Sequence, residues 1–257
     1  MKVIILAAGQ GSRLRPLTDE KPKCMVEING KSIIKRQLDT LMSVGVEEND
    51  IYILTGYKSE VLKEYLKDTK INFIENSQYE STNMVCTLMC AKNVLKLNDD
   101  IIVSYGDIVY EKNVISKLIE SKNEISVIVD SGWYEYWQKR SENPIDDAES
   151  LIICNDSIVE IGQKIEDISK IDYQYIGLMK YSGQGINRLI DTCEKAKIIS
   201  ANGQKLWRTS RNYSNMYMTD LLQGLIDENY EIKPVIINRG WYEIDNYRDL
   251  KVAENEI

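Results

Sequence analysis

The residues best suited to chemistry near the start of the chain follow an apolar run, residues 3–8. Gly9 and Gly11 come directly after this run, and Arg13 and Lys23 follow them. Glycine lets backbone amides approach a phosphate closely, because it has no Cβ. Arginine can donate paired hydrogen bonds to phosphate oxygens, and lysine adds a point charge. This spacing predicts a phosphate site at the end of a first strand.

Two common phosphate-binding patterns do not fit these residues. A Walker A loop needs four residues between its glycines and then Gly-Lys-Ser or Gly-Lys-Thr. A dinucleotide fingerprint needs a third glycine or an alanine where this chain has Leu14. The simpler interpretation, a tight connection between a strand and a loop, stays open. Arg15 and Lys21 nearby add positive charge without a clear role.

The composition limits the remaining chemistry. The chain has 257 residues, no histidine and a formal net charge of -8. Without histidine there is no Ser-His-Asp triad, Cys-His pair or histidine acid–base catalysis. The acidic balance argues against nucleic acid or an anionic membrane as a partner. Carboxylates, lysine, arginine, metal ions and backbone amides must therefore do any chemistry.

The cysteines and the apolar segments predict a cytoplasmic protein. The 5 cysteines are scattered and odd in number, which favours reduced thiols over a disulfide framework. No apolar run reaches the roughly 18 residues of a spanning helix, and the opening MKVIILAAG is too short for a signal peptide.

Strand-like and helix-like segments alternate along the first half of the chain. This rhythm predicts an α/β, Rossmann-like three-layer sandwich with a mostly parallel mixed sheet and a smaller covering subregion. Thr82 is the expected N-cap of one helix. We expect strands at 2–8, 50–57, 71–76, 100–110 and 124–130, and helices at 31–45, 59–67, 82–95 and 113–121.

The rhythm changes after about residue 130. We expect a hairpin over 150–162 that turns at Asn155-Asp156, and a strand over 174–182. Helices at 185–197 and 217–228 and two apolar segments, 232–238 and 241–246, complete the chain. We see no linker or repeat. Residues 1–257 therefore form one domain, with a nucleotide-binding half, 1–130, and an acceptor-binding and covering half, 131–257.

A resemblance to a known family appears in the first loop. Residues 6–34 read LAAGQGSRLRPLTDEKPKCMVEINGKSII and resemble LAAGxGxRLxPLTxxxPKxLVxxxGKPLI, the signature of nucleotidyltransferases that make nucleotide sugars and CDP-alcohols. Met25 and Ser32 depart from it at positions that do not handle phosphate. YGDIVY, VEIGQKIED and QYIGLMKYS resemble later family segments, and GWYEIDNYRDL resembles the end of phosphocholine cytidylyltransferases.

This resemblance implies an enzyme that joins a nucleoside triphosphate to a phosphomonoester and releases pyrophosphate. Arg13 would stabilise the β- and γ-phosphates, and Lys23 would lie between the α-phosphate and the acceptor phosphate. Asp107 and Asp245 would hold Mg²⁺, and Glu243 would serve the metal or the acceptor. The plainer alternatives are that Arg13 and Lys23 are solvated surface cations, that Asp107 forms a turn, and that Asp245 caps the last helix.

The resemblance also implies residues that bind each substrate. Asn83 would contact the base of the nucleotide, and its alternative role is a helix cap. Lys164 would bind the acceptor phosphate, and its alternative is an exposed position on the surface. The tryptophans suit a cage for a quaternary ammonium group, but we favour core and lid packing. The nucleotide-binding residues would be Leu6, Ala8, Gly9, Gly11, Ser12, Arg13, Lys23 and Asn83. The acceptor-binding residues would be Trp133, Glu149, Lys164, Tyr175, Gly177, Trp241 and Glu243.

The later motifs favour CTP and a small acceptor. Residues 142–164 and 174–182 look closest to cytidylyltransferases that act on phosphoglutamine for bacterial capsule modification. Phosphocholine and 2-aminoethylphosphonate are the next acceptors. One alternative is a hexose-1-phosphate nucleotidyltransferase that uses UTP, dTTP or GTP. Another is a nucleotide-sensing homologue without catalytic activity.

Overall fold

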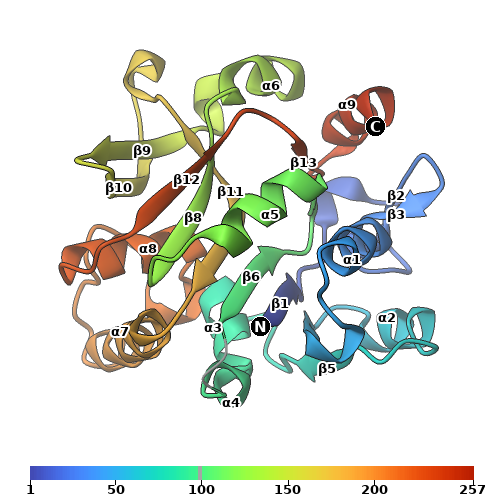
Figure 1. The fold of residues 1–257 in the computed structure, drawn as a ribbon, viewed down its shortest axis with the longest axis horizontal. Helices are drawn as coiled ribbons and strands as arrows, with labels where there is room; N and C mark the ends of the chain where they lie inside the picture. Colours follow the sequence, from blue (N-terminus) through green and yellow to red (C-terminus); the bar gives the residue numbers. More distant parts are fainter. Residues whose placement is uncertain (98–99) are drawn as a thin grey trace.

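The computed structural model describes residues 1–97 and 100–257, and these are built around one seven-stranded sheet (Figure 1). The strand order is β12–β8–β11–β6–β1–β4–β5. β11 runs antiparallel to β6 and β8, whereas the other neighbouring pairs are parallel. The predicted mostly parallel mixed sheet is therefore confirmed. Its strands are β1 (Lys2–Ala7), β4 (Ile51–Thr55), β5 (Asn72–Glu75), β6 (Ile101–Tyr105), β8 (Ile125–Asp130), β11 (Gln174–Tyr181) and β12 (Lys233–Ile237).

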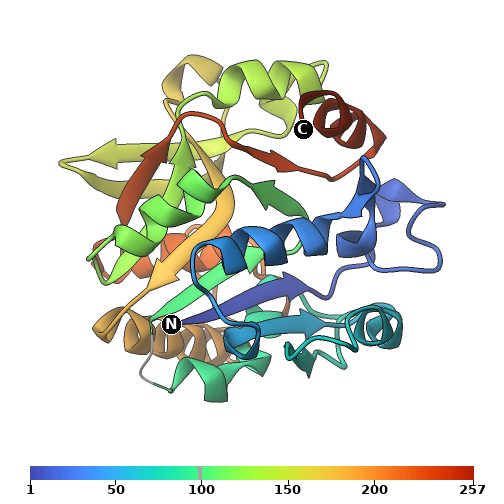
Figure 2. The same cartoon turned by 45° about the vertical axis from the view of Figure 1, so that its right-hand side comes forward.

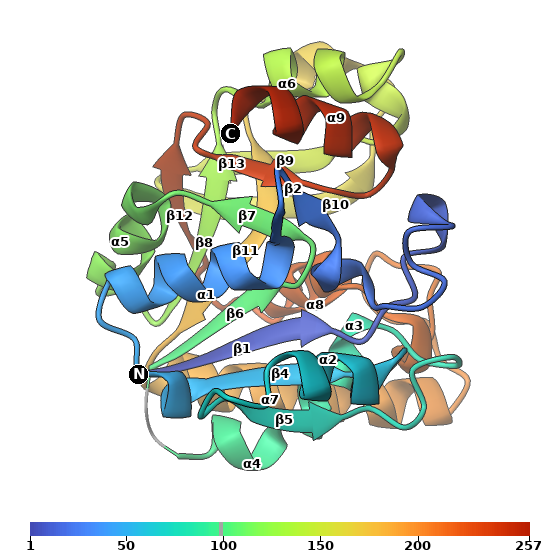
Figure 3. The same cartoon turned by 90° about the vertical axis from the view of Figure 1, so that its right-hand side faces the viewer.

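Helices cover both faces of this sheet, which explains why central strands such as β1 and β4 are mostly apolar and buried. In β1, Ile4 and Leu6 pack into one core, whereas Val3 and Ile5 pack into the other. The first core includes α3 (Met84–Cys90), α4 (Lys92–Leu95), α7 (Gln184–Ala201) and α8 (Met218–Asp227). The second includes α1 (Ile33–Ser43), α2 (Ser59–Tyr65), α5 (Lys112–Glu120) and α6 (Trp133–Arg140), and α1 and α5 are clear in Figure 3.

The helix over 82–95 differs from its prediction in two ways. It is divided into α3 and α4, and its N-cap is Asn83 rather than Thr82. Thr82 is engaged in the preceding turn, because its hydroxyl donates to the Gln78 carbonyl at 2.7 Å and accepts from Asn76 at 3.0 Å. None of the helices in the described residues is both long and apolar enough to cross a membrane.

Three small two-stranded sheets surround the central one, and all are antiparallel. Asn155 and Asp156 both have positive φ, 48° and 59°, as the tight turn of the predicted hairpin requires. The hairpin and α6 lie on the β8–β12 side of the molecule (Figure 2). The pairs are β2 (Glu27–Ile28) with β3 (Lys31–Ser32), β7 (Ile108–Tyr110) with β13 (Trp241–Glu243), and β9 (Glu149–Cys154) with β10 (Ser157–Lys164).

A third, smaller core joins the end of the chain to the first loop. It contains Leu14, Ile28, Ile244 and Leu250, all buried. The last helix, α9 (Tyr247–Glu256), contributes Leu250 to this core. The segment after β13 is therefore held against the first loop, although the two lie at opposite ends of the sequence.

Candidate active site

The first loop brings Lys23 under the glycine turn. Gly11 has φ +65°, in the left-handed region that glycine adopts without strain. A Cβ on Gly11 would lie 2.8 Å from Cβ of Lys23 and 3.2 Å from Cγ2 of Thr18. The Thr18 hydroxyl donates to the Gly11 carbonyl at 2.9 Å. Gly11 is therefore needed for the close approach of Lys23 as well as for the turn.

Lys23 joins two carboxylates. Its Nζ donates to Oδ2 of Asp107 at 2.6 Å and also to Oδ1 of Asp245. Burial alone would lower the pKa of Lys23, but the charges of Asp107 and Asp245 raise it above its ordinary value. Lys23 is therefore cationic at neutral pH and lies where negative charge gathers.

Strand pairing brings Asp107 and Asp245 together. Asp107 lies in the turn between β6 and β7, and Asp245 lies two residues after β13. β7 and β13 pair with Ile108 opposite Glu243, and the Ile244 amide donates to the Asp107 carbonyl at 3.0 Å. The β7–β13 ladder therefore aligns two acidic segments that are distant in the sequence.

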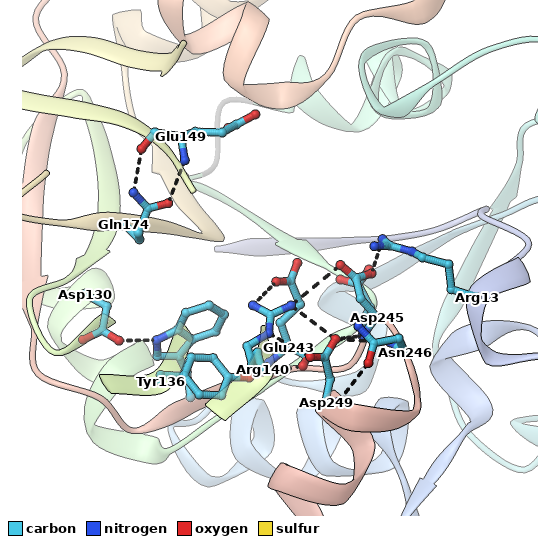
Figure 4. A network of polar contacts seen from close by, with 12 residues as sticks. Arg13, Asp130, Tyr136, Arg140, Glu149, Gln174, Glu243, Asp245, Asn246 and Asp249 are labelled. Carbon is cyan, nitrogen blue, oxygen red and sulfur yellow. Dashed lines mark hydrogen bonds and ion pairs between the residues drawn. The ribbon is translucent and has the colours of Figure 1, made fainter. Parts of the chain in front are cut away.

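The acidic residues form a group that fits a divalent cation. Oxygens of Asp107, Glu243 and Asp245 all lie within 4.8 Å of one another. Oδ1 of Asp107 is buried and has no hydrogen-bond partner in the described part of the chain. Mg²⁺ prefers carboxylate oxygens, so these residues suit Mg²⁺ in chemistry and in placement. Arg13 reaches the same group, with Nη2 3.0 Å from Oδ1 of Asp245 (Figure 4).

Burial and neighbouring charges separate the pKa values of Glu243 and Asp245. Burial raises the pKa of Glu243 to about 8, although Arg140 opposes the shift. Burial also acts on Asp245, but Lys23 and then Arg13 outweigh it and lower the pKa. Of these two carboxyls, Glu243 therefore takes up a proton more readily and Asp245 keeps its charge more readily.

Two cavities meet at these acids. The first has a volume of about 140 Å³ and the second about 370 Å³, and Met84 and Asp107 line both. The first is lined by Leu6, Ala7, Ala8, Gly9, Lys23, Cys24, Tyr79, Thr82, Asn83, Met84, Thr87, Gly106 and Asp107. The second is lined by Arg13, Met84, Tyr105, Asp107, Trp137, Asp147, Glu149, Ser150, Ile161, Gln174, Tyr175, Ile176, Gly177, Tyr217, Thr219, Glu243 and Asp245.

Most of the predicted nucleotide-binding residues line the first cavity, namely Leu6, Ala8, Gly9, Lys23 and Asn83. Gly11 and Ser12 do not line it, and Arg13 lines the second cavity instead. Asn83 caps α3 and also faces the cavity. Its Oδ1 accepts from the Met84 amide at 2.8 Å, so its two suggested roles are compatible.

The predicted acceptor-binding residues divide into two groups. Glu149, Tyr175, Gly177 and Glu243 line the second cavity, whereas Trp133, Lys164 and Trp241 do not. Lys164 is exposed at the end of β10.

Trp133 and Trp241 belong to the core and do not form a cage at the cavity. They are 3% and 1% exposed, and the Trp241 indole nitrogen donates to Asp130 at 2.8 Å.

Gly177 has φ +82°, and a Cβ there would lie 2.5 Å from the Tyr105 ring. The Tyr105 side chain therefore already occupies the space that a side chain at position 177 would need.

Sequence reasoning missed residues that only the fold brings to the site. Tyr79 and Thr87 line the first cavity, and Asp147 and Tyr217 line the second. Arg140 lines neither, but its guanidinium contacts the acids from behind (Figure 4). Asp147 lies in the segment 142–164, which carries the family resemblance, whereas Tyr79, Thr87 and Arg140 lie outside the segments that carry it. Arg140 stands beside the tryptophans in the sequence, where its charge suits a zwitterionic acceptor, but the structure places it against the acids and in neither cavity.

Comparisons with known proteins give a matching family, a close relative in sequence and similar solved structures. Residues 2–141 match the family model described as Nucleotidyl transferase. The CTP:phosphoglutamine cytidylyltransferase of Campylobacter jejuni subsp. jejuni serotype O:2 is 42% identical over 257 residues, 98% of each chain. The CTP:phosphocholine cytidylyltransferase from Streptococcus pneumoniae has a TM-score of 0.72 at 20% identity, over 99% of this chain and 98% of that one. The inositol-1-phosphate CTP transferase from T. maritima has a TM-score of 0.71 at 22% identity, over 98% and 93%.

Proposed function

The chain belongs to the nucleotidyl transferase family, as its first loop predicted, and we propose that it joins CTP to a small phosphate or phosphonate with release of pyrophosphate. Phosphoglutamine is the favoured acceptor, and phosphocholine and 2-aminoethylphosphonate come next. The high identity to the Campylobacter enzyme over nearly the whole of both chains supports this choice. The product would serve the modification of a bacterial capsule or surface polysaccharide.

The shared wall of the two cavities is the observation that carries this proposal. All residues of the first cavity belong to the segment 1–130, whereas most of the second belong to 131–257. We assign the nucleotide to the first cavity and the acceptor to the second. Asp107 lines both, and Lys23 is bonded to it, so the α-phosphate and the acceptor phosphate would meet there.

The reaction needs no general base, which suits a chain without histidine. A phosphate monoester has a second pKa of about 6 and is largely dianionic at neutral pH. One of its oxygens attacks the α-phosphorus of CTP, and the bond from that phosphorus to the β-phosphate oxygen breaks. Pyrophosphate leaves with the electron pair. The remaining task of the protein is to position two anions and to balance their charge.

The cations and carboxylates have separate tasks in this scheme. Lys23 would contact the α-phosphate and the acceptor phosphate, and Arg13 the departing pyrophosphate. Asp107 and Asp245 would hold Mg²⁺, and Glu243, whose carboxylate lies near theirs, would assist them. When bound, Mg²⁺ would neutralise charge on the triphosphate oxygens.

The lining of the second cavity supports an acceptor with a positive group. Arg13 is the one basic side chain among the described residues that line it, whereas Asp147 and Glu149 are acidic. Burial raises the pKa of both carboxyls, so both would gain from a cationic neighbour. Phosphoglutamine, phosphocholine and 2-aminoethylphosphonate each carry an ammonium group, and glucose-1-phosphate does not.

Pyrophosphate release measured with Mg²⁺ tests the proposal. CTP, UTP, dTTP, ATP and GTP would each be combined with phosphoglutamine, phosphocholine, 2-aminoethylphosphonate and glucose-1-phosphate. We expect release with CTP and one acceptor that carries an ammonium group. Release with glucose-1-phosphate alone would assign the chain to the hexose-phosphate enzymes. CTP binding without release for any pair would favour a nucleotide-sensing role.

A further inference from the structure

We infer that Arg140 is a positioning residue that holds the metal-binding carboxylates in place. This inference rests on the proposed function, because it concerns the group formed by Asp107, Glu243 and Asp245. Arg140 lines neither cavity, and its side chain is only 4% exposed. It therefore acts on the acids from the protein side rather than on a substrate.

The guanidinium of Arg140 contacts two carboxylates and approaches a third. Nη1 lies 2.7 Å from Oε2 of Glu243, and Nε donates to Oδ1 of Asp249 at 3.0 Å. Nη2 donates to Oδ2 of Asp249 at 3.3 Å and lies 3.8 Å from Oδ2 of Asp245. In Figure 4, Asp245 lies between Arg140 on one side and Arg13 on the other.

Asp249 passes this restraint to the backbone of the metal-binding segment. It is 1% exposed, and its Oδ2 accepts from the amides of Asp245 at 2.9 Å and Asn246 at 3.1 Å. Arg140 therefore fixes the carboxylate of Glu243 directly and the backbone at Asp245 through Asp249. Both contacts therefore restrain the segment that carries Glu243 and Asp245, and not a distant part of the core.

The helix that carries Arg140 adds a second restraint. The hydroxyl of Tyr136, also on α6, accepts from the Glu243 amide at 2.8 Å and donates to the Glu243 carbonyl at 3.2 Å. The ring of Tyr136 lies 5.2 Å from the guanidinium of Arg140. α6 thus locks both the backbone and the side chain of Glu243 in one place.

Loss of Arg140 would leave carboxylates buried without their counter-charge. Such groups move apart toward water, because a buried unpaired charge is costly. This movement takes ligand oxygens away from the metal site. Lysine at this position would restore the charge, but it lacks the planar fork that reaches Glu243 and Asp249 together.

Arg239 offers a matched control for a purely structural role. Like Arg140, it pairs with a buried aspartate, with Nη1 2.8 Å from Oδ2 of Asp130. Its guanidinium also packs on the Tyr136 ring, 3.9 Å from the centroid. Asp130 and Arg239 line neither cavity and do not belong to the acidic group.

Mn²⁺ binding to the full chain without substrates, followed by electron paramagnetic resonance and calorimetry, tests the inference. We expect Arg140→Met to raise the dissociation constant about 10-fold or more, as is usual when an outer partner of metal ligands is lost. Arg140→Lys should fall between Arg140→Met and wild type, and Arg239→Met should match wild type. Circular dichroism would confirm that each variant folds. If Arg140→Met does not fold, the Mn²⁺ affinity of Arg140→Lys becomes the deciding measurement.

Three results would overturn the inference: unchanged Mn²⁺ affinity in folded Arg140→Met or Arg140→Lys, equal weakening in Arg239→Met, or no Mn²⁺ binding by wild type. The measurement uses no nucleotide and no acceptor. A wrong choice of substrate in the proposed function therefore leaves its outcome unchanged, and the two failures can be told apart.

Discussion

Nζ of Lys23 lies 2.6 Å from Oδ2 of Asp107 at the wall that separates the two cavities. The same nitrogen also donates to Asp245. Lys23 thus occupies the position in which a divalent cation would meet both carboxylates. In the proposed reaction it would give up at least one of these hydrogen bonds in order to contact phosphate.

Replacement of Lys23 by methionine should separate catalysis from metal binding. We expect kcat/KM for pyrophosphate release to fall at least about 100-fold, because a charge aimed at the transition state is lost. Mn²⁺ affinity of the substrate-free enzyme should rise, because a competing cation is removed. Lys21→Met is the control, since Lys21 lines neither cavity. Unchanged turnover in Lys23→Met would refute the role given to this lysine.

The turn glycine next to Lys23 gives a second prediction. Gly11→Ala and Gly30→Ala both place a side chain at positive φ, 65° and 78°, and each should lower the free energy of unfolding by about 1 kcal/mol. The new methyl at Gly11 meets Lys23 at 2.8 Å, whereas the one at Gly30 meets nothing within 4 Å. We therefore expect only Gly11→Ala to lose kcat/KM, by about 10-fold. Equal activities would show that the contact with Lys23 does not matter.

Asn83 can be tested without loss of its helix cap. Serine is an equally good N-cap residue, so Asn83→Ser should retain the stability of α3. It lacks the side-chain amide that faces the first cavity, and we expect KM for CTP to rise about 10-fold. Thermal melts and steady-state kinetics measure the two effects. A normal KM in the serine variant would leave Asn83 with the cap alone.

Glu243 should make stability depend on pH in the absence of metal. Its pKa of about 8 in the folded protein exceeds the ordinary value of 4.5, so the folded state binds more protons between these values. Stability from this group is therefore lost as the pH rises from 5 toward 8. Glu243→Gln lacks this loss, so its unfolding free energy relative to wild type should increase with pH. Urea denaturation in chelator would measure it, and a difference independent of pH would contradict the shift.

The sequence was sufficient for the parts of the site that follow strand ends. The apolar run before Gly9 identifies the edge of the sheet, because parallel strands deliver their carboxyl ends to one side. The role expected of Asp107, after β6, came from the family resemblance. Lys23 and Asp245 required the family resemblance, since their meeting depends on the β7–β13 pairing of distant segments.

Other features depend on which way a side chain faces, and the sequence does not encode this locally. Trp133 and Trp137 lie one turn apart on α6, yet Trp137 lines the second cavity and Trp133 does not. Thr82 and Asn83 are both good N-caps, and the choice between them depends on bonds from Thr82 to the preceding turn. Arg140 is recognisable only once Glu243 and Asp249 lie beside it.

Phosphorus NMR of the chain with CTP, phosphoglutamine and Mg²⁺ tests whether the cytidylyl group passes directly to the acceptor phosphate. We expect the signals of both substrates to decline together. A new pair of coupled diphosphate resonances, one from the acceptor phosphorus, should grow with free pyrophosphate, and Lys23→Met should show almost none of it. Consumption of CTP without a signal that couples the acceptor phosphorus to the α-phosphorus would contradict direct transfer between the two cavities.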